Sequence, residues 1–185
     1  MEYLINRNDV EIYIQDTKVI DMYEFKDEDN VIQYNSGKDY AAETVAHLVD
    51  EMSNRYEYLK KHGFKSLVEC NRKDKPKFLF LFVEELASFS PKDDKDYYKG
   101  LAELLAKGRA AGIFVVIATQ APYSEILPGM LKNNINTILG LKTRTGEASK
   151  VICNNYDALT KLRGKGHGIL FNANGEFEIQ VFNIN

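Results

Sequence analysis

The sequence has 185 residues, 44% of them apolar, which is enough for one globular domain with one core and too little for two domains of ordinary size. A formal net charge of −3 excludes the basic surface of a stand-alone DNA-binding module, so any contact with nucleic acid must be local or shared among subunits. No apolar run approaches the ~20 residues of a membrane-spanning helix, no signal peptide opens the chain, and Cys70 and Cys153 show no disulfide or zinc pattern. We therefore expect a cytoplasmic protein, and a membrane tether of the parent protein would lie outside this sequence.

The first half of the chain alternates between strand and helix patterns. Residues 11–16 are a short β-rich run that ends in an acid, and residues 39–61 carry apolar side chains at helical spacing. Residues 77–83 are apolar at every position after Lys77, which predicts a central parallel strand that helices cover on both faces. The charged stretches 26–29 and 90–96 predict exposed loops.

The alternation continues in the second half. Residues 96–109 predict a helix, 113–118 a second buried strand, 135–141 a further strand and 146–153 a short helix. Pro128 restricts any helix in residues 124–134 to a late start or a bend. Residues 168–172 and 177–182 predict a hairpin that turns at Asn174-Gly175. The whole pattern predicts one α/β domain over residues 1–185, with three layers, a mostly parallel sheet and a C-terminal β-hairpin.

Two adjacent acids, Glu84 and Glu85, follow the apolar strand in KFLFLFVEELASF. An apolar strand that ends in acids is typical of the Walker B segment of P-loop ATPases, and open α/β sheets bind ligands at this end of the strands. Glu84 would then hold the water shell of Mg²⁺ and Glu85 would polarise the attacking water. The alternative, which the motif alone leaves open, is a strand that ends in two solvated glutamates.

Thr119 and Gln120 follow the second buried strand and would lie at the same edge of the sheet if the two strands are neighbours. A hydroxyl and an amide at this place can bind or sense a γ-phosphate. Polar turn residues that satisfy local backbone groups are the alternative.

Arg109 ends the helix before that strand, where a cation also suits the helix dipole. Its functional interpretation is an arginine finger, which acts on a phosphate bound by a neighbouring subunit and therefore requires an oligomer.

Three cations, Lys142, Arg144 and Lys150, surround the end of the strand predicted at residues 135–141. They could contact a phosphate backbone if this loop lined a pore, and a solvated loop is the alternative.

Four blocks of sequence in the same order resemble the motor domain of the FtsK/SpoIIIE family of DNA translocases. The blocks are FLFVEELASF, LAELLAKGRAAGIFVVIATQAP, GMLKNNINTILGLKTRTGEASKVI and LRGKGHGILF. Upstream, EIYIQDTK resembles the family's strand that ends in an acid followed by a lysine, and DEMSNRYEYLKKHGFKSLVECN resembles the helix and loop before its Walker B strand. The resemblance spans residues 11–182.

This resemblance implies a RecA-like P-loop NTPase fold in a ring, usually a homo-hexamer, that moves double-stranded DNA through its pore with ATP and Mg²⁺. Such proteins serve chromosome segregation at division, phage or conjugative DNA transfer, or specialised protein secretion. By matching position, Glu84 is implied as the Walker B acid with Mg²⁺ bound through water, and Glu85 as the catalytic glutamate. Gln120, next to Thr119, is implied as the phosphate sensor, Arg109 as the trans-acting arginine, and residues 142–150 as a region near the pore.

The sequence departs from the family pattern in two respects. The usual Asp-Glu pair is Glu84-Glu85 here, which lengthens the first side chain by one methylene. No G-x-x-x-x-G-K-[ST] phosphate loop occurs anywhere in the chain, although the family places one before EIYIQD. We therefore expect a piece of a longer translocase that lacks the P-loop strand and helix and that hydrolyses ATP negligibly by itself.

Two other functions remain open at this stage. The rival interpretation is a degenerate, non-catalytic subunit that gives protein contacts or an arginine to an active motor. A motor that exports polypeptide would share every motif quoted above.

Overall fold

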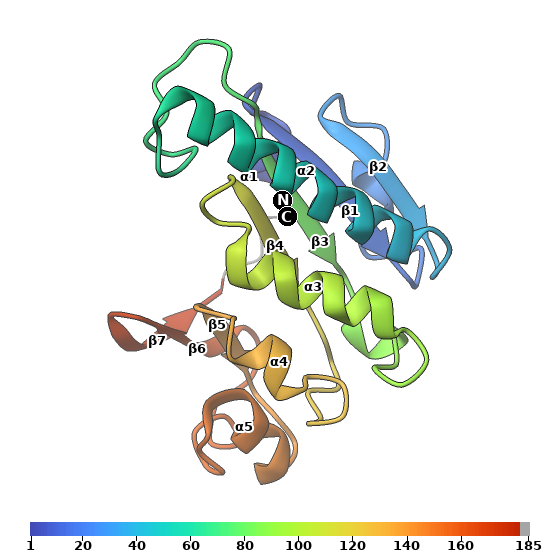
Figure 1. Ribbon diagram of the computed structural model, residues 1–185. Helices are drawn as coiled ribbons and strands as arrows, with labels where there is room; N and C mark the ends of the chain where they lie inside the picture. Colours follow the sequence, from blue (N-terminus) through green and yellow to red (C-terminus); the bar gives the residue numbers. More distant parts are fainter. Residues whose placement is uncertain (182–185) are drawn as a thin grey trace. The chain divides into compact units, whose positions relative to one another are not determined.

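The computed structural model describes residues 1–181, which form two compact units (Figure 1). The N-terminal unit is Met1–Gln120, and the C-terminal unit begins at Ala121. Phe182, the predicted end of the last hairpin, lies outside the described residues. The assignment of both units to one domain stays a prediction.

The N-terminal unit is built on a parallel sheet of four strands in the order β2-β1-β3-β4. Its helices and strands are α1 (Glu2–Ile5), β1 (Val10–Asp16), the 3-10 helix η1 (Tyr23–Phe25), β2 (Val31–Ser36), α2 (Ala41–His62), β3 (Phe78–Val83), the 3-10 helix η2 (Leu86–Ser88), α3 (Lys95–Lys107) and β4 (Ile113–Ile117). The predicted strands at 11–16, 77–83 and 113–118 and the predicted helices at 39–61 and 96–109 are confirmed to within two residues at each end.

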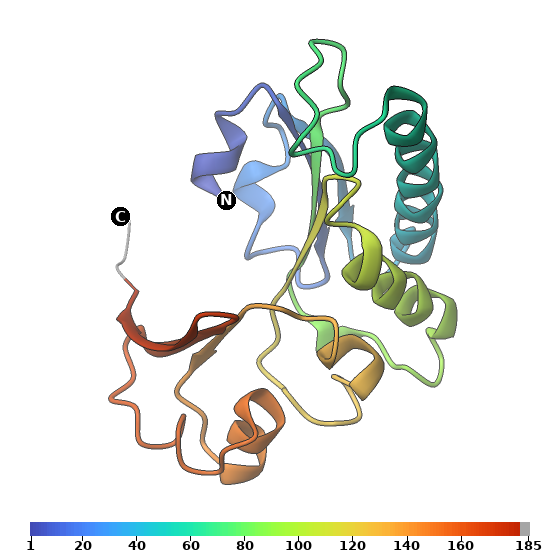
Figure 2. The ribbon, with the colours of Figure 1, turned by 60° about the vertical axis from the view of Figure 1, so that its left-hand side comes forward.

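Helices cover both faces of this sheet, with α2 and α3 on one face and α1 and η1 on the other (Figure 2). The side chains of β3 alternate between the faces because successive residues of a strand point to opposite sides. Leu79, Leu81 and Val83 are buried, while Phe78, Phe80 and Phe82 pack in the cluster that includes residues of α1 and η1. The prediction of a central strand covered on both faces is therefore confirmed for β3.

Helices α2 and α3 approach each other closely at Gly100. A Cβ atom at Gly100 would lie 2.4 Å from Cγ1 of Val45 on α2, so only glycine fits there. Buried residues of α2 recur at three- and four-residue intervals through Val45, Leu48 and Met52, which is the spacing of one helix face. This packing fixes both helices on the sheet, and both begin near the carboxyl ends of the strands.

The C-terminal unit contains a small antiparallel sheet of three strands in the order β5-β6-β7. Its elements are α4 (Gly129–Lys132), β5 (Ile138–Leu141), α5 (Gly146–Cys153), β6 (His167–Asn172) and β7 (Gly175–Gln180). Helix α4 begins directly after Pro128, as the late start predicted for this segment requires. Leu159 is fully buried against Gly140 of β5, and the Ser149 hydroxyl accepts a hydrogen bond from the Leu159 N–H at 3.1 Å.

Three local predictions were wrong, and one strand was missed. The sequence analysis missed β2, and it expected β4 to be buried although β4 is an edge strand on which Val116 is 42% exposed. It placed the strand at 135–141 after the parallel strands, whereas β5 pairs antiparallel with β6 in a separate sheet. The last hairpin turns at Ala173-Asn174, since Gly175 already pairs with Asn172. The errors on β4 and β5 concern strand neighbours, which the pattern of a single segment does not specify.

Candidate active site

Backbone hydrogen bonds on both sides hold the acid pair at the carboxyl end of β3. The N–H of Glu84 donates to the carbonyl of Gln15 on β1 at 3.0 Å, and the N–H of Leu86 donates to the carbonyl of Ala118 after β4 at 3.0 Å. The chain therefore continues the ladder of the sheet for a few residues beyond β3. Glu84 and Glu85 are each 7% exposed, so the prediction of their place is confirmed and the alternative of two solvated glutamates is wrong.

The carboxylate of Glu85 is surrounded by hydrogen-bond donors. Its Oε1 accepts from the Thr119 hydroxyl at 2.6 Å and from the Ala87 N–H at 3.1 Å. The Gln120 N–H lies 3.1 Å from Oε2 and 3.3 Å from Oε1. The residues that follow β3 and β4 therefore lie side by side, as predicted, and the loop after β4 fixes the orientation of Glu85.

The carboxylate of Glu84 has a different environment. Its Oε1 accepts a hydrogen bond from the Lys18 ammonium at 3.2 Å. Its Oε2 is buried and has no hydrogen-bond partner among the described residues. A buried carboxylate oxygen without a donor is uncommon and marks a place where a water molecule or an ion fits.

Lys18 is a site residue that the sequence analysis did not identify. It follows β1, the neighbour of β3, and its ammonium lies 3.2 Å from Glu84 Oε1 and 3.6 Å from Glu85 Oε2. The signal was present in EIYIQDTK, because a strand that ends in polar residues beside the acid strand brings them to the same edge. The sequence analysis noted the acid and the following lysine at the end of this strand as part of the family resemblance, but it assigned no site role to Lys18.

The two neighbouring carboxyl groups have pKa values shifted in opposite directions. Burial is the largest effect on Glu84 and raises the pKa of its carboxyl. The neighbouring Asp21 carboxyl raises it further, and the Lys18 ammonium only partly offsets these two effects. Burial also raises the pKa of Glu85, but the hydrogen bonds from Thr119, Gln120 and Ala87, together with Lys18, outweigh it and leave that pKa lowered. The protein therefore stabilises the charge of Glu85 and disfavours the charge of Glu84.

Gln120 contributes its backbone to the site and leaves its side chain exposed. Thr119 is half-buried and contributes its hydroxyl. The interpretation of Thr119 and Gln120 as turn residues that satisfy local backbone groups is therefore incomplete. Both residues donate a hydrogen bond to the carboxylate of Glu85, which follows another strand. The sensor role of Gln120 stays a prediction.

Arg109 does not join the acid pair. It is exposed and follows the carboxyl end of α3, at the edge of the sheet where β4 begins. The acids lie at the other edge, where β3 ends. Lys142, Arg144 and Lys150 are exposed residues of the C-terminal unit, and the Lys150 ammonium donates a hydrogen bond to the Tyr156 hydroxyl at 2.9 Å.

The oxygen atoms at the acid pair fit one part of a nucleotide site. Mg²⁺ takes one or two carboxylates together with water and phosphate oxygens, and the unpartnered Oε2 of Glu84 suits such a hydrated ion. No cluster of three metal-binding side chains occurs in residues 1–181, so a cation here would depend on water and phosphate for most of its ligands. The glycine-rich loop that would cradle phosphates is absent from the sequence.

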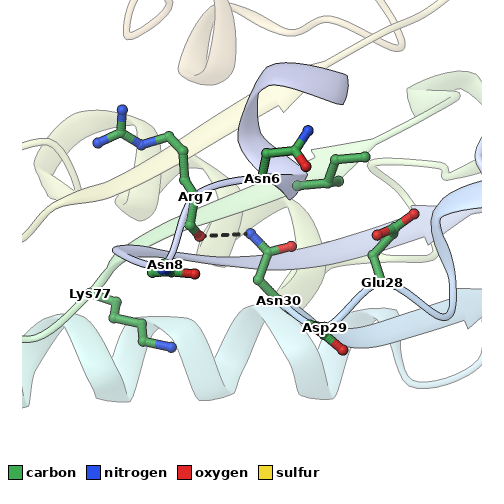
Figure 3. Close-up of a pocket in the computed structure, with 8 residues that line it drawn as sticks. Asn6, Arg7, Asn8, Glu28, Asp29, Asn30 and Lys77 are labelled. Atoms are coloured by element: carbon green, nitrogen blue, oxygen red, sulfur yellow. Dashed lines mark hydrogen bonds between the residues drawn. The ribbon is translucent and has the colours of Figure 1, made fainter.

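A polar pocket of about 380 Å³ lies at the opposite edge of the sheet, at the amino ends of β1, β2 and β3 (Figure 3). Asn30 lies in it and donates a hydrogen bond to the Arg7 carbonyl at 3.2 Å. Lys77, also in the pocket, forms an ion pair with Glu11 at 3.5 Å. None of the predicted site residues lines this pocket, so the candidate site is the acid edge.

Curated relatives are similar over most of the chain. The DNA translocase FtsK of Streptomyces coelicolor is 32% identical over 145 residues, which are 70% of this chain and 16% of that protein. FtsK of Streptococcus pneumoniae is 30% identical over 138 residues, 68% of this chain and 18% of that protein. The chain belongs to the FtsK/SpoIIIE family. It spans less than a fifth of the length of these FtsK relatives.

Solved structures show the fold of this family member. The pCW3 conjugation coupling protein TcpA, in a monomer form with ATPγS, superposes with a TM-score of 0.81 at 20% identity over 98% of this chain and 54% of that chain. ATPases 2 and 3 of EssC from Geobacillus thermodenitrificans give a TM-score of 0.74 at 15% identity over 94% of this chain and 33% of that chain. The predicted three-layer, RecA-like fold with a mostly parallel sheet and a C-terminal hairpin is confirmed.

Two further findings concern family models and membrane-spanning helices. No family model matches its sequence. Within residues 1–181, none of the helices combines the length and the apolar composition that crossing a bilayer requires.

Proposed function

We propose that this chain is part of an ATP-driven motor that translocates double-stranded DNA in the cytoplasm, with both units acting as one motor domain. The observation that carries the proposal is the buried acid pair at the end of the central strand, where Thr119 and Gln120 from the neighbouring strand bind Glu85. The similarity to FtsK proteins supports DNA as the cargo.

In this proposal each acid has its own role. Glu84, through its unpartnered Oε2, binds the water shell of Mg²⁺, and Glu85, held ionised by its donors, orients and polarises the attacking water. Bound ATP and Mg²⁺ supply the phosphoryl group and the charge that stabilises its transfer. Gln120 senses the phosphate through its exposed side chain.

Arg109 acts on a neighbouring subunit. Helix α3 has 13 residues, or about 20 Å at the rise of an α-helix, and it separates Arg109 from the edge that carries the acids. An extended arginine side chain is much shorter than this, so Arg109 does not serve the acid pair of its own chain. This arrangement supports a ring of identical subunits, a hexamer by analogy with the family, in which each arginine faces the nucleotide of the next subunit.

ATP turnover tests the catalytic part of the proposal. Alone, the chain should hydrolyse ATP negligibly, because the donors that would position the phosphates are missing from its sequence. When it is mixed with an intact FtsK-type motor, DNA-stimulated turnover should depend on this chain's Glu85 and Arg109. Robust, Mg²⁺-dependent turnover by the chain alone that Glu85→Gln abolishes would refute the need for another phosphate loop.

DNA binding tests the cargo. The triple variant Lys142→Ala, Arg144→Ala, Lys150→Ala should weaken binding of the assembled motor to double-stranded DNA and lower the dependence of the affinity on salt. Lys161→Ala is the matched control, since Lys161 is an exposed cation of the same unit that pairs with Asp157 at 2.9 Å. An equal effect of both changes would contradict the assignment of the three cations.

A non-catalytic role is the second candidate function. The oxygen atoms of Glu85 already accept hydrogen bonds from Thr119, Gln120 and Ala87, which leaves little room for a water molecule on this carboxylate. In that role the chain supplies protein contacts or Arg109 to an active motor. Mixed motors that lose turnover with Arg109→Ala and keep it with Glu85→Gln would favour this role.

Protein export is a third candidate, which the similarity of the fold to EssC supports. Binding of a secreted polypeptide in place of salt-dependent DNA binding by the assembled motor would favour it.

A further inference from the structure

The Lys18 side chain is the one cation that contacts both acids among the described residues. Its ammonium lies 3.2 Å from Glu84 and 3.6 Å from Glu85, and it reaches Asp21 at 3.8 Å. The side chain of Lys18 is 38% exposed, whereas those of Glu84 and Glu85 are 8% and 9% exposed. The ammonium therefore covers the acids from the solvent side.

The backbone around Lys18 is held on both sides, which aims its side chain at the acids. The buried Asp16 accepts hydrogen bonds from the N–H groups of Val19 at 2.9 Å and Met22 at 3.0 Å. The Thr17 hydroxyl is 2.7 Å from the Ser88 hydroxyl, on the segment that follows the acids. Val19 has a φ of 60°, which is strained for a β-branched residue. Such strain persists only where surrounding contacts determine the conformation.

The acid pair also offers a place for a cation that the ammonium does not fill. Oε2 of Glu84 is buried and has no hydrogen-bond partner in the part of the chain that the structure describes, while Oε1 of the same carboxylate binds Lys18. A hydrated divalent cation at Oε2 would lie beside the ammonium, and two positive charges at such a distance repel strongly in a partly buried site. Lys18 has a flexible side chain with a single charged end, so it can leave without a change in the fold.

We propose that Lys18 is a positioning residue that takes the place of the divalent cation at Glu84 and must swing away before the cation binds. The purpose of this exchange rests on the proposed function: Lys18 would keep the acid pair oriented until a nucleotide with its cation arrives. Lys18 thereby sets the affinity of the site for the cation without touching the reacting atoms.

Binding of Mn²⁺ to the chain, followed by electron paramagnetic resonance of the free ion, tests this competition. Lys18→Met removes the competing charge and should tighten Mn²⁺ binding about tenfold, as expected for one unit charge close to a divalent ion in salt. Lys18→Arg keeps the charge and should stay within about twofold of the wild type. Lys77→Met is the matched control, because Lys77 forms a comparable ion pair with Glu11 at the other edge of the sheet. Adding Glu84→Gln to Lys18→Met should remove the gain.

Thermal unfolding gives a second readout that needs no ATP or DNA. Lys18→Met should lower the melting temperature, and MgCl2 should restore it, while the same salt should affect the wild type and Lys77→Met much less. If Lys18→Met does not fold, Lys18→Gln removes the charge and keeps a donor for Glu84. Mn²⁺ affinity of the Lys18 variant equal to that of the wild type, or an equal gain in Lys77→Met, overturns the proposal. A motor that fails to hydrolyse ATP leaves these results unchanged, so the two proposals fail separately.

Discussion

Neutralising the two adjacent acids one at a time should have different effects on the free energy of unfolding. Glu84→Gln and Glu85→Gln are the same chemical change at neighbouring residues that are each 7% exposed. They differ in their partners, since Glu85 accepts from three donors that are part of the fold, whereas among the described residues Glu84 accepts from Lys18 and lies beside the Asp21 carboxyl. The comparison therefore isolates the hydrogen bonds from burial and position.

The loss for Glu85→Gln follows from those three donors. A hydrogen bond to a charged acceptor contributes about 1.5–3 kcal/mol and one to a neutral acceptor about 0.5–1.5 kcal/mol. The new NH2 group would also face the Gln120 N–H, which is a donor beside a donor. Part of the loss is offset because an amide is easier to bury than a carboxylate. We expect a net decrease of about 2 kcal/mol in the free energy of unfolding.

Glu84→Gln should leave the free energy of unfolding unchanged or raise it, because burial disfavours the charge of Glu84. Urea unfolding at pH 7, followed by far-UV circular dichroism, measures both variants, and Glu69→Gln on the exposed surface is the control. If Glu85→Gln proves as stable as Glu84→Gln, the described donors do not stabilise the carboxylate and the reasoning is wrong.

Two further predictions concern titration and packing. In carbon-detected NMR titrations, the pKa of Glu84 should lie above the ordinary value of a glutamate and that of Glu85 below it. Glu85 therefore stabilises the fold above its unfolded pKa and loses this contribution as pH falls through its folded pKa. Glu84 acts in the opposite sense, since its cost at neutral pH disappears as pH falls through its folded pKa; equal values for the two would contradict the assigned causes. Leu81→Ala on the buried central strand should lower the free energy of unfolding by about 2–5 kcal/mol, whereas Val116→Ala on the edge strand should change it by less than about 1 kcal/mol in the same urea assay.

The central strand β3 was predicted well because its burial demands an apolar side chain at every position. β3 reads FLFLFV because β1 and β4 lie on either side and helices lie on both faces, so each position needs an apolar side chain. β2 reads VIQYNS and lies at the edge, where Asn35 binds Thr44 of α2 and Gln33 binds Asn35. Polar side chains with specific partners hide the strand pattern, and this is why β2 was missed.

The candidate site was predictable where it depends on strand ends and unpredictable where it depends on loops. Glu85 and Thr119 were expected together because parallel neighbours end at one edge. The position of Lys18 after β1 indicates the edge at which it lies, but its contact with the acids also depends on the following loop, where Asp16 accepts hydrogen bonds from two N–H groups that the strand pattern does not specify. The antiparallel pairing of β5 with β6 was also not predictable, because the pattern of a four-residue strand does not specify its partner strand.

The outer edge of β4 has a consequence for handling the purified protein. Within the described residues, β4 is bonded to a strand on one side only, and it reads IFVVI with no charged residue. Unpaired N–H and C=O groups along an apolar edge strand can form hydrogen bonds with a strand of a second polypeptide. Natural proteins protect such edges with charged residues, proline or a covering segment. Storage at high concentration will therefore favour aggregates that start at this strand. A segment that covers the outer edge of β4 will keep the chain soluble.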